Sequence, residues 1–160
     1  MTSGDARDEI DYLGYTLGQQ AVVSALGDII ALQACPMLIT PVPGTKPWIQ
    51  GLATISGDLL PIMDVPQWLG LSASATQSSA KLLVVERDGV RCGLMVTSVI
   101  GRMTGTVRSQ AVTTESGQLQ PYVSTVLHTD QAEWLVLELA VLLSDARLMT
   151  NCMDHPGLVG

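Results

Sequence analysis

The sequence predicts a mainly β fold built from two small barrels that lie side by side, with short helices and a C-terminal helix. Two tight turns of the same kind support this prediction: Ser56-Gly57-Asp58 and Asp88-Gly89 each separate two short apolar runs, as in β-hairpins. A small, polar stretch at residues 72–79 lies between these hairpins and is expected to be a flexible loop. Because the repeat is weak, a single continuous antiparallel sandwich stays open as an alternative.

Composition and charge narrow the classes of partner. Hydrophobic residues make up 47% of the 160-residue chain and charged residues only 14%, so either some apolar surface faces a partner or the core is unusually well filled. The formal net charge is -7, and the eight Lys and Arg are scattered along the chain. Without a basic stripe to neutralise phosphates, nucleic acid and anionic membrane surfaces are poor partners.

The cysteines and the apolar runs indicate the compartment. Cys35, Cys92 and Cys152 are an odd number with no CxxC spacing, and no basic stretch followed by an apolar signal region opens the chain. We therefore expect a reduced, cytoplasmic protein. The apolar runs are far shorter than the ~20 residues that span a bilayer, so no direct membrane insertion is expected.

The first elements are expected after a disordered N-terminus of residues 1–10. Apolar and small residues alternate over residues 12–17, which predicts a strand with one buried face. Asp28 is placed to cap a short helix over residues 29–32. Nearby prolines leave residues 37–40 as an edge strand.

The stretch from Pro47 to Val65 is the most informative part of the chain. A turn at Trp48 is expected to lead into a strand at residues 52–55 and, through the tight turn, a partner strand at residues 59–63. Pro61 in that second strand predicts a sheet edge or a bulge, because proline donates no ladder hydrogen bond. Asp64 then caps a short helix that has Pro66 in its first turn.

The second half of the chain is expected to contain further strands and a closing helix. The strands are predicted at residues 81–87, 90–96, 101–107, 122–128 and 133–138, and the helix at residues 140–148. A polar loop is expected around residues 115–117. The predicted domain covers residues 11–149, with one subdomain at about 21–71, a second at about 81–137, residues 11–20 and 138–149 completing the fold, and a flexible tail at 150–160.

Catalytic and metal-binding interpretations have little support in the residues. A nucleophilic pair of Cys92 and His128 would need their side chains to converge, and an ordinary core thiol and half-buried histidine are the simpler reading. Asp58 and Asp64 could form a carboxylate pair, but the first fits a turn and the second a helix cap. With two histidines and no close cysteine or carboxylate cluster, no metal or cofactor is expected.

The large flexible and aromatic side chains have two possible roles. Trp48, beside Pro47 and near a predicted sheet edge, is equally suited to an interface and to the core. Trp68 and Trp134 are expected in the core. The seven methionines could line an adaptable groove, although filling gaps in the core is their more frequent role.

The pattern P-x-W-I-x-G-L-x-x-x-x-G-x-L-L-P-I-M-D at residues 47–64 resembles the hallmark of CheW-like domains. These are adaptors of bacterial chemosensory arrays that link receptors to a CheA-type histidine kinase. The likeness extends over about residues 11–148. It is greatest to the PilI-type branch of type IV pilus (twitching motility) systems, on the strength of Trp48, residues 59–64, residues 126–128 and residues 134–136.

This resemblance implies two roughly five-stranded β-barrels around a shared core and no catalytic centre. It also implies a receptor in the groove between the barrels, a kinase regulatory domain on the first barrel, and ring-like assembly through the second. The site residues carried over by position fall in two sets. The receptor-binding set is Ile30, Thr54, Ser56 and Asp64, and the kinase-binding set is Leu38, Thr40, Val42 and Trp48.

Two positions depart from the family pattern. Relatives usually carry an arginine where this chain has Ser56, and an aspartate where it has Thr97. If those two charges pair with one another or with the receptor in relatives, both are missing here, so receptor recognition is expected to be weaker, altered or carried by other residues.

The sequence thus predicts a non-enzymatic, cytoplasmic adaptor that is recruited to membrane receptor arrays. Its expected partners are a CheA-type histidine kinase and a methyl-accepting chemoreceptor. The alternative, from another functional class, is a small β-barrel protein that binds an apolar small molecule between its halves.

Overall fold

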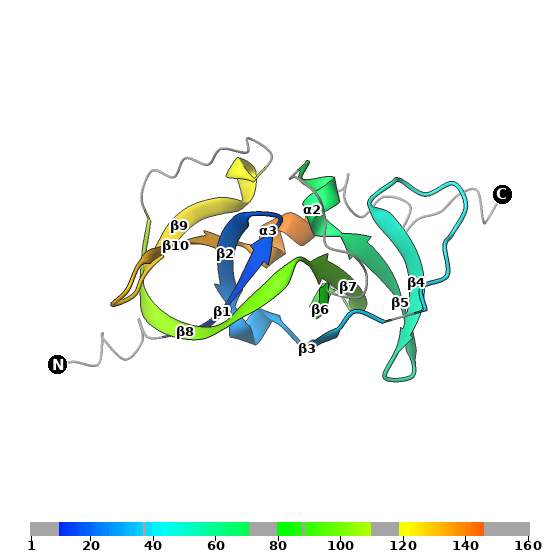
Figure 1. The fold of residues 1–160 in the computed structure, drawn as a ribbon, viewed down its shortest axis with the longest axis horizontal. Helices are drawn as coiled ribbons and strands as arrows, with labels where there is room; N and C mark the ends of the chain where they lie inside the picture. The colour runs from blue at the N-terminus through cyan, green and yellow to red at the C-terminus, as the bar shows by residue number, and fades with distance from the viewer. Residues whose placement is uncertain (1–9, 37, 71–79, 88, 110–118, 146–160) are drawn as a thin grey trace.

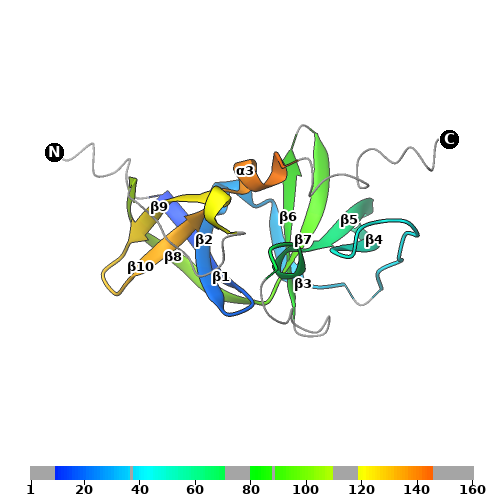
Figure 2. The same ribbon diagram turned by 90° about the horizontal axis from the view of Figure 1, so that it is seen from above.

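The chain folds into two five-stranded β-sheets joined side by side (Figures 1 and 2). The computed structural model describes residues 10–36, 38–70, 80–87, 89–109 and 119–145. The first sheet is a closed barrel in the order β1-β2-β10-β9-β8. Its strands are β1 (Ile10–Leu17), β2 (Gln20–Ala25), β8 (Ser98–Ser109), β9 (Val123–His128) and β10 (Glu133–Leu137).

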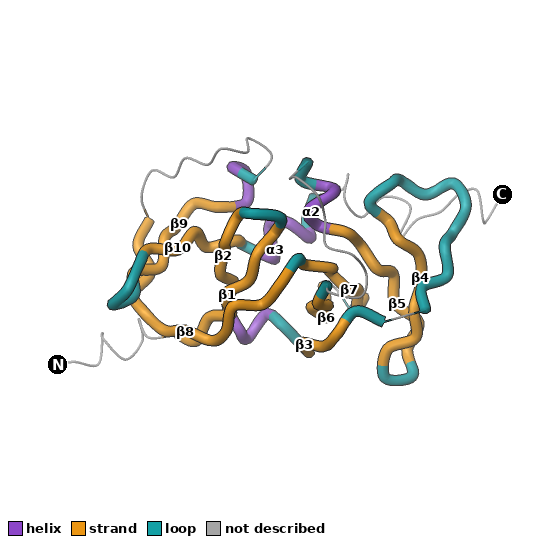
Figure 3. Tube along the Cα trace, in the orientation of Figure 1, coloured by secondary structure: helices purple, strands orange, loops and turns teal. Residues whose placement is uncertain are grey.

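The second sheet has the order β3-β6-β7-β5-β4. Its strands are β3 (Ala31–Ala34), β4 (Ile49–Ile55), β5 (Asp58–Asp64), β6 (Lys81–Arg87) and β7 (Val90–Val96). Strands dominate the described chain, and its helical segments are short (Figure 3). The predicted mainly β fold with two five-stranded units is confirmed. The single-sandwich alternative is wrong, because one sheet closes on itself.

The segments that form each sheet differ from the two expected subdomains, residues 21–71 and 81–137. Strands β6 and β7 pair with β3 and β5 of the earlier unit, whereas β8, β9 and β10 close the barrel with the N-terminal strands. The hairpin signals indicate only which neighbouring runs pair. The parallel pairs β2–β10 and β5–β7 join segments that are distant in sequence, and no local pattern reports such contacts.

Both predicted hairpins are confirmed. In the first, Ile55 pairs with Asp58, and the two turn residues have positive φ angles of 51° at Ser56 and 86° at Gly57. These are the signs of a type I′ turn, whose twist matches that of the flanking strands. In the second hairpin, β6 and β7 pair along their whole length up to Arg87 and Val90.

The predicted helix at residues 29–32 is wrong. A 3₁₀ turn, η1 (Leu26–Asp28), comes earlier, and the chain then extends into β3. Pairing with β6 explains the difference, since the Ile30 N–H donates to the Val84 carbonyl at 2.7 Å and the next four residues continue the ladder. The edge strand expected at residues 37–40 is reduced to one bridge between Thr40 and Leu52, and Met37 lies outside the described residues.

Strand β5 lies inside the sheet, between β7 and β4, so the edge position inferred from Pro61 is wrong. Pro61 is opposite Leu52, whose own N–H and carbonyl point away to Thr40. The nitrogen of Pro61 therefore faces the side of β7, and the pairing with β7 begins only at Ile62. The missing N–H of proline costs this strand no ladder hydrogen bond.

Two short helices complete the fold. The predicted helix after Asp64 is confirmed as α2 (Val65–Trp68), and the closing helix is α3 (Leu139–Leu143), which lies between the two sheets in Figure 2. The helix ends at Leu143, with Ser144 as its C-cap, so the predicted extension to residue 148 is wrong. The loops expected at residues 72–79 and 115–117 lie outside the described residues. None of the described helices has the length and apolar character to cross a bilayer.

The largest core cluster spans both sheets. Leu13, Tyr15 and Leu17 of β1 pack in the same cluster as buried side chains of the second sheet such as Leu83 and Leu94. Trp68 packs against this cluster and Trp134 against a smaller one within the barrel, and both are half-buried. A shared core makes the two sheets one folding unit rather than two independent barrels.

A buried hydrogen-bonded chain links β1, β2 and β10. The buried Ser24 hydroxyl donates to the Leu137 carbonyl at 2.8 Å, so the Tyr15 hydroxyl, 2.7 Å away, is the donor to Ser24 Oγ. Burial raises the pKa of Tyr15 far above its ordinary value and keeps the phenol protonated at physiological pH.

Replacing Ser24 by alanine is expected to lower the free energy of unfolding by about 2 kcal/mol, because it leaves a buried hydroxyl and a buried carbonyl unsatisfied. Urea unfolding measures this change. Tyr15→Phe is the matched control, since Ser24 keeps its bond to Leu137, and it should cost about 1 kcal/mol. The double variant should lose less free energy of unfolding than the sum of the two single losses. Strict additivity would contradict the hydrogen bond between Tyr15 and Ser24.

Candidate protein-interaction surfaces

The outer face of the β4–β5 hairpin carries apolar side chains. Along β4 the buried positions Ile49, Gly51, Ala53 and Ile55 alternate with Gln50, Leu52 and Thr54, which point outward. Across the hairpin, Leu52 pairs with Pro61 and Thr54 with Leu59. Directly opposed residues point to the same side of a sheet, so these four side chains share one face.

The segment before β4 extends this face. Thr40 pairs with Leu52, and two residues earlier Leu38 is 80% exposed, whereas Ile39 between them packs against a core cluster. Leu59 is 63% exposed. We call this surface the β4 face and define it by Leu38, Thr40, Leu52, Thr54, Leu59 and Pro61. Exposed apolar side chains on a sheet face that has few charges are typical of protein-binding surfaces.

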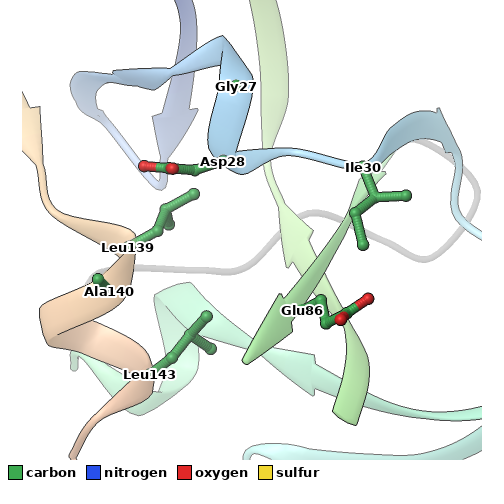
Figure 4. A pocket seen from close by; sticks show the side chains of 7 residues that line it. All are labelled: Gly27, Asp28, Ile30, Glu86, Leu139, Ala140 and Leu143. Atoms are coloured by element: carbon green, nitrogen blue, oxygen red, sulfur yellow. The ribbon is translucent and has the colours of Figure 1, made fainter. Parts of the chain in front are cut away.

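A groove lies between α3 and β6. It has a volume of about 410 Å³ and is lined by Gly27, Asp28, Ile30, Glu86, Leu139, Ala140 and Leu143 (Figure 4). Leu139 and Leu143 are buried, whereas Ile30 is 46% exposed. We call it the α3 groove. It joins elements of the barrel side to an element of the second sheet.

The predicted site residues do not gather as expected. Thr54 of the receptor set lies on the β4 face together with Leu38 and Thr40 of the kinase set, and Ser56 is exposed in the adjoining turn. Ile30 lines the α3 groove, next to β3 at the other end of the strand order. Half-buried Val42 and Trp48 lie in the connection that leads into β4.

Comparison with known proteins gives the family. A model of the CheW-like domain matches residues 11–147. The chain belongs to the CheW-like domain family. Its relatives include Protein PilI of Pseudomonas aeruginosa, 34% identical over 126 residues that cover 78% of this chain and 70% of the relative. Chemotaxis protein CheW of Thermotoga maritima is 23% identical over 144 residues, 90% of this chain and 94% of the relative.

A solved structure shows the same CheW-like fold. The crystal structure of the scaffolding protein TtCheW from Thermoanaerobacter tengcongensis superimposes with a TM-score of 0.74 at 17% identity. The match covers 89% of this chain and 98% of that one. The resemblance deduced from residues 47–64 is therefore confirmed at the level of family and fold.

In this CheW-like chain Asp64 is not a surface residue. It is 4% exposed, and its carboxylate accepts from the Gln67 N–H at 3.1 Å, which caps α2. The predicted cap is confirmed, and its burial argues against the receptor-binding role that we expected for the same residue. A side chain that accepts a hydrogen bond from a free backbone N–H in the first turn of a helix contributes to the stability of the fold.

Asp64→Ala is expected to lower the free energy of unfolding by about 1 kcal/mol, because an N-terminal amide of α2 loses its acceptor. Asp64→Asn keeps a side-chain oxygen and should stay close to the wild type. Thermal unfolding of the two variants measures the difference. Loss of receptor binding by a fully stable Asp64→Asn variant would restore the surface role.

An aromatic chain connects the two sheets. Trp48, which precedes β4, lies edge-on to Trp68 of α2 with ring centroids 6.2 Å apart, and Trp68 packs against Tyr122 at 5.6 Å. Tyr122 belongs to η2 (Gln120–Tyr122), and its hydroxyl donates to Asp145, just after α3, at 2.6 Å. Trp48 therefore packs against the shared core with a half-buried ring, and its interface role stays a prediction.

The two departures from the CheW-like pattern lie far apart. Ser56 precedes β5, whereas Thr97 follows β7, which runs parallel to β5 with Met95 beside Asp64. The positions are separated by the length of β5, roughly 20 Å at about 3.3 Å per residue, so charged residues there would not pair. The Thr97 hydroxyl accepts from the Gly18 N–H at 2.8 Å and so has a structural partner.

The pairs considered for catalysis do not come together. Cys92 is buried in the second sheet, and His128 is in the barrel with Nδ1 3.0 Å from Glu133. Asp58 is exposed at one end of β5, near Arg91, and Asp64 is buried at the other. Among the described residues no three His, Cys, Asp or Glu side chains gather in a way that could hold a metal ion.

Sequence reasoning missed several residues of both surfaces. Leu59 could have been found, because a two-residue turn fixes it opposite Thr54. Asp28, Glu86 and Leu143 of the α3 groove come from three separate elements, and no local signal brings such residues together.

Proposed function

We propose that this CheW-like protein is a non-enzymatic adaptor that couples a chemoreceptor to a CheA-type histidine kinase. The β4 face binds the CheW-like regulatory domain of the kinase, and the α3 groove binds the receptor. The likeness to PilI supports a place in a system that controls type IV pili and twitching motility, and the protein would work in the cytoplasm at membrane receptor arrays.

The observation that carries this proposal is the presence of two separate apolar surfaces on one chain of this family. Leu38 and Leu59 are exposed at the β4 side of the second sheet, and Ile30 is exposed at the β3 side. A protein that holds two partners at once raises their effective concentration near each other without any chemistry of its own.

Under this proposal the site residues divide differently from the two sets inferred from the resemblance. Thr54 and Ser56 join Leu38 and Thr40 as kinase-side residues because they lie on or beside the β4 face. Ile30 keeps its receptor-side role, and Asp64 has no direct role in binding. Val42 and Trp48 support the segment that leads into β4.

A crossed binding experiment tests the assignment. The chain is mixed with the kinase or with the cytoplasmic region of the receptor, and binding is measured by gel filtration and calorimetry. Leu38→Asp should weaken kinase binding by about tenfold or more and leave receptor binding intact, because a buried charge at an interface centre is costly. Ile30→Asp should do the reverse.

Ile100→Asp is the matched control. Ile100 is similarly exposed, at 47%, but lies on β8 of the barrel, outside both surfaces, so this variant should bind both partners like the wild type. Co-purification of an apolar small molecule with no binding of kinase or receptor would contradict the adaptor and support a ligand-binding protein.

A further inference from the structure

The α3 groove combines an apolar floor with acidic walls. Buried Leu139 and Leu143 form part of its lining, and exposed Ile30 borders it. The charged residues in the described part of the lining are both acidic: Asp28 enters from η1 and Glu86 from β6 (Figure 4). Among the described residues that line the groove there is no lysine or arginine.

A third carboxylate lies close to this groove. Glu138 directly precedes α3 and makes no side-chain capping bond to that helix. Burial, and then the negative charges of Glu138 and Asp28, raise the pKa of Tyr12, so both carboxylates lie within electrostatic reach of the same phenol. Within the described parts of the chain, neither Asp28 nor Glu138 has an ion-pair partner.

Among the residues that the structure describes, Glu86 alone of these three acids has an ion-pair partner. Glu86 Oε1 lies 3.2 Å from Arg91 Nε, and both side chains are more than 40% exposed, so solvent weakens this pair. The groove therefore keeps a negative potential in a chain whose net charge is already -7. A partner that buried only apolar side chains here would leave these carboxylates facing an uncharged surface, with no attraction gained in return.

We propose that the receptor segment bound in the α3 groove presents an apolar side chain flanked by lysine or arginine side chains. The apolar side chain packs on Leu139 and Leu143, and the cations approach Asp28 and Glu86. This inference rests on the proposed function for the identity of the partner, and it adds the chemistry by which that partner is recognised.

The test removes charge while keeping shape. The double variant Asp28→Asn/Glu86→Gln should bind the cytoplasmic region of the receptor about tenfold more weakly than the wild type in low salt. At about 1 M salt, where the Debye length falls to roughly 3 Å, the two proteins should bind alike. At every salt concentration the double variant should bind the kinase as tightly as the wild type does.

A matched control removes the same charge elsewhere. Asp130→Asn/Glu133→Gln changes two exposed acids on the β9–β10 hairpin of the barrel, and it should bind the receptor region like the wild type. Equal weakening by this control would overturn the proposal, because overall charge rather than the groove would then govern binding. An unchanged affinity for the groove variant in low salt would also overturn it.

A failure of the proposed function looks different. In that case the wild-type protein would not bind the receptor region at any salt concentration, and the groove proposal would fall with it. If the wild type binds and Ile30→Asp abolishes binding while Asp28→Asn/Glu86→Gln has no effect, the groove is the receptor site and only the charge inference is wrong.

Discussion

Gly51→Ala is expected to lower the free energy of unfolding by about 3 kcal/mol and to abolish kinase binding at the β4 face. Gly51 has a φ of +139°, which side-chain-bearing residues rarely adopt. A Cβ at this position would overlap the Thr40 carbonyl oxygen and would lie 2.6 Å from the Thr40 carbonyl carbon and 2.9 Å from Pro41 Cα. Since these are backbone atoms, the segment that carries Leu38 and Thr40 must move away from β4.

Gly57→Ala is a control that separates backbone strain from steric overlap with neighbouring atoms. Gly57 also has a positive φ, +86°, but a Cβ there would meet no atom within 4 Å. This control should cost only about 1–2 kcal/mol and should leave kinase binding nearly unchanged. Denaturant unfolding and calorimetric titration with the kinase measure both quantities. Equal effects of the two substitutions would mean that the close approach of Thr40 to β4 does not shape the kinase-binding surface.

Trp68→Ala is expected to lower the free energy of unfolding by about 3 kcal/mol, because the ring packs against the core that both sheets share. It also contacts Trp48 on one side and Tyr122 on the other. Unfolding by guanidinium chloride, followed by circular dichroism, measures the loss. Trp68→Phe keeps an aromatic ring at this position and should cost clearly less.

The contact between the two tryptophans can be measured separately. A double-mutant cycle with Trp48→Leu and Trp68→Leu should give a coupling energy of about 1 kcal/mol, as edge-to-face aromatic pairs do. Trp134, which packs within the barrel, supplies the control: a cycle of Trp134→Leu with Trp48→Leu should be additive. No coupling between Trp48 and Trp68 would show that the rings fill space independently.

The elements that were predicted correctly depend on neighbours in sequence. The Ser56-Gly57 turn has two residues with positive φ. The sequence indicates it through a glycine in a short polar stretch between two apolar runs. The cap at Asp64 needs an acceptor one position before a helix and a proline in its first turn. Such features are decided within four or five residues, so one sequence is enough to predict them.

The predictions that failed depended on segments far away. Residues 29–32 have the pattern of a short helix, but pairing with β6, fifty residues later, draws this part of the chain into an extended form. Pro61 indicates an edge or a bulge when β5 is considered alone, yet β5 is internal and its pairing with β7 begins only after the proline, at Ile62. Local propensity is overridden where distant backbone groups supply hydrogen bonds.

The candidate surfaces show the same division. Leu38, Thr40 and Thr54 were inferred by position from the family resemblance, whereas only the Thr40–Leu52 bridge shows that they share one face. Asp64 was correctly predicted as the cap of α2, but only its burial argued against a role of the carboxylate in receptor binding.

The sequence by itself determined the mainly β character, the two tight hairpins and the cap of α2, because each follows from short-range steric and hydrogen-bonding preferences. The family was indicated by the resemblance of residues 47–64 to a known pattern. The tertiary structure alone decided which hairpin joins which sheet, which side of β4 is exposed, and that η1, β6 and α3 meet in an acidic groove. Those features come from packing and pairing between residues distant in the chain, and the free energy of such contacts belongs to the whole fold rather than to any segment.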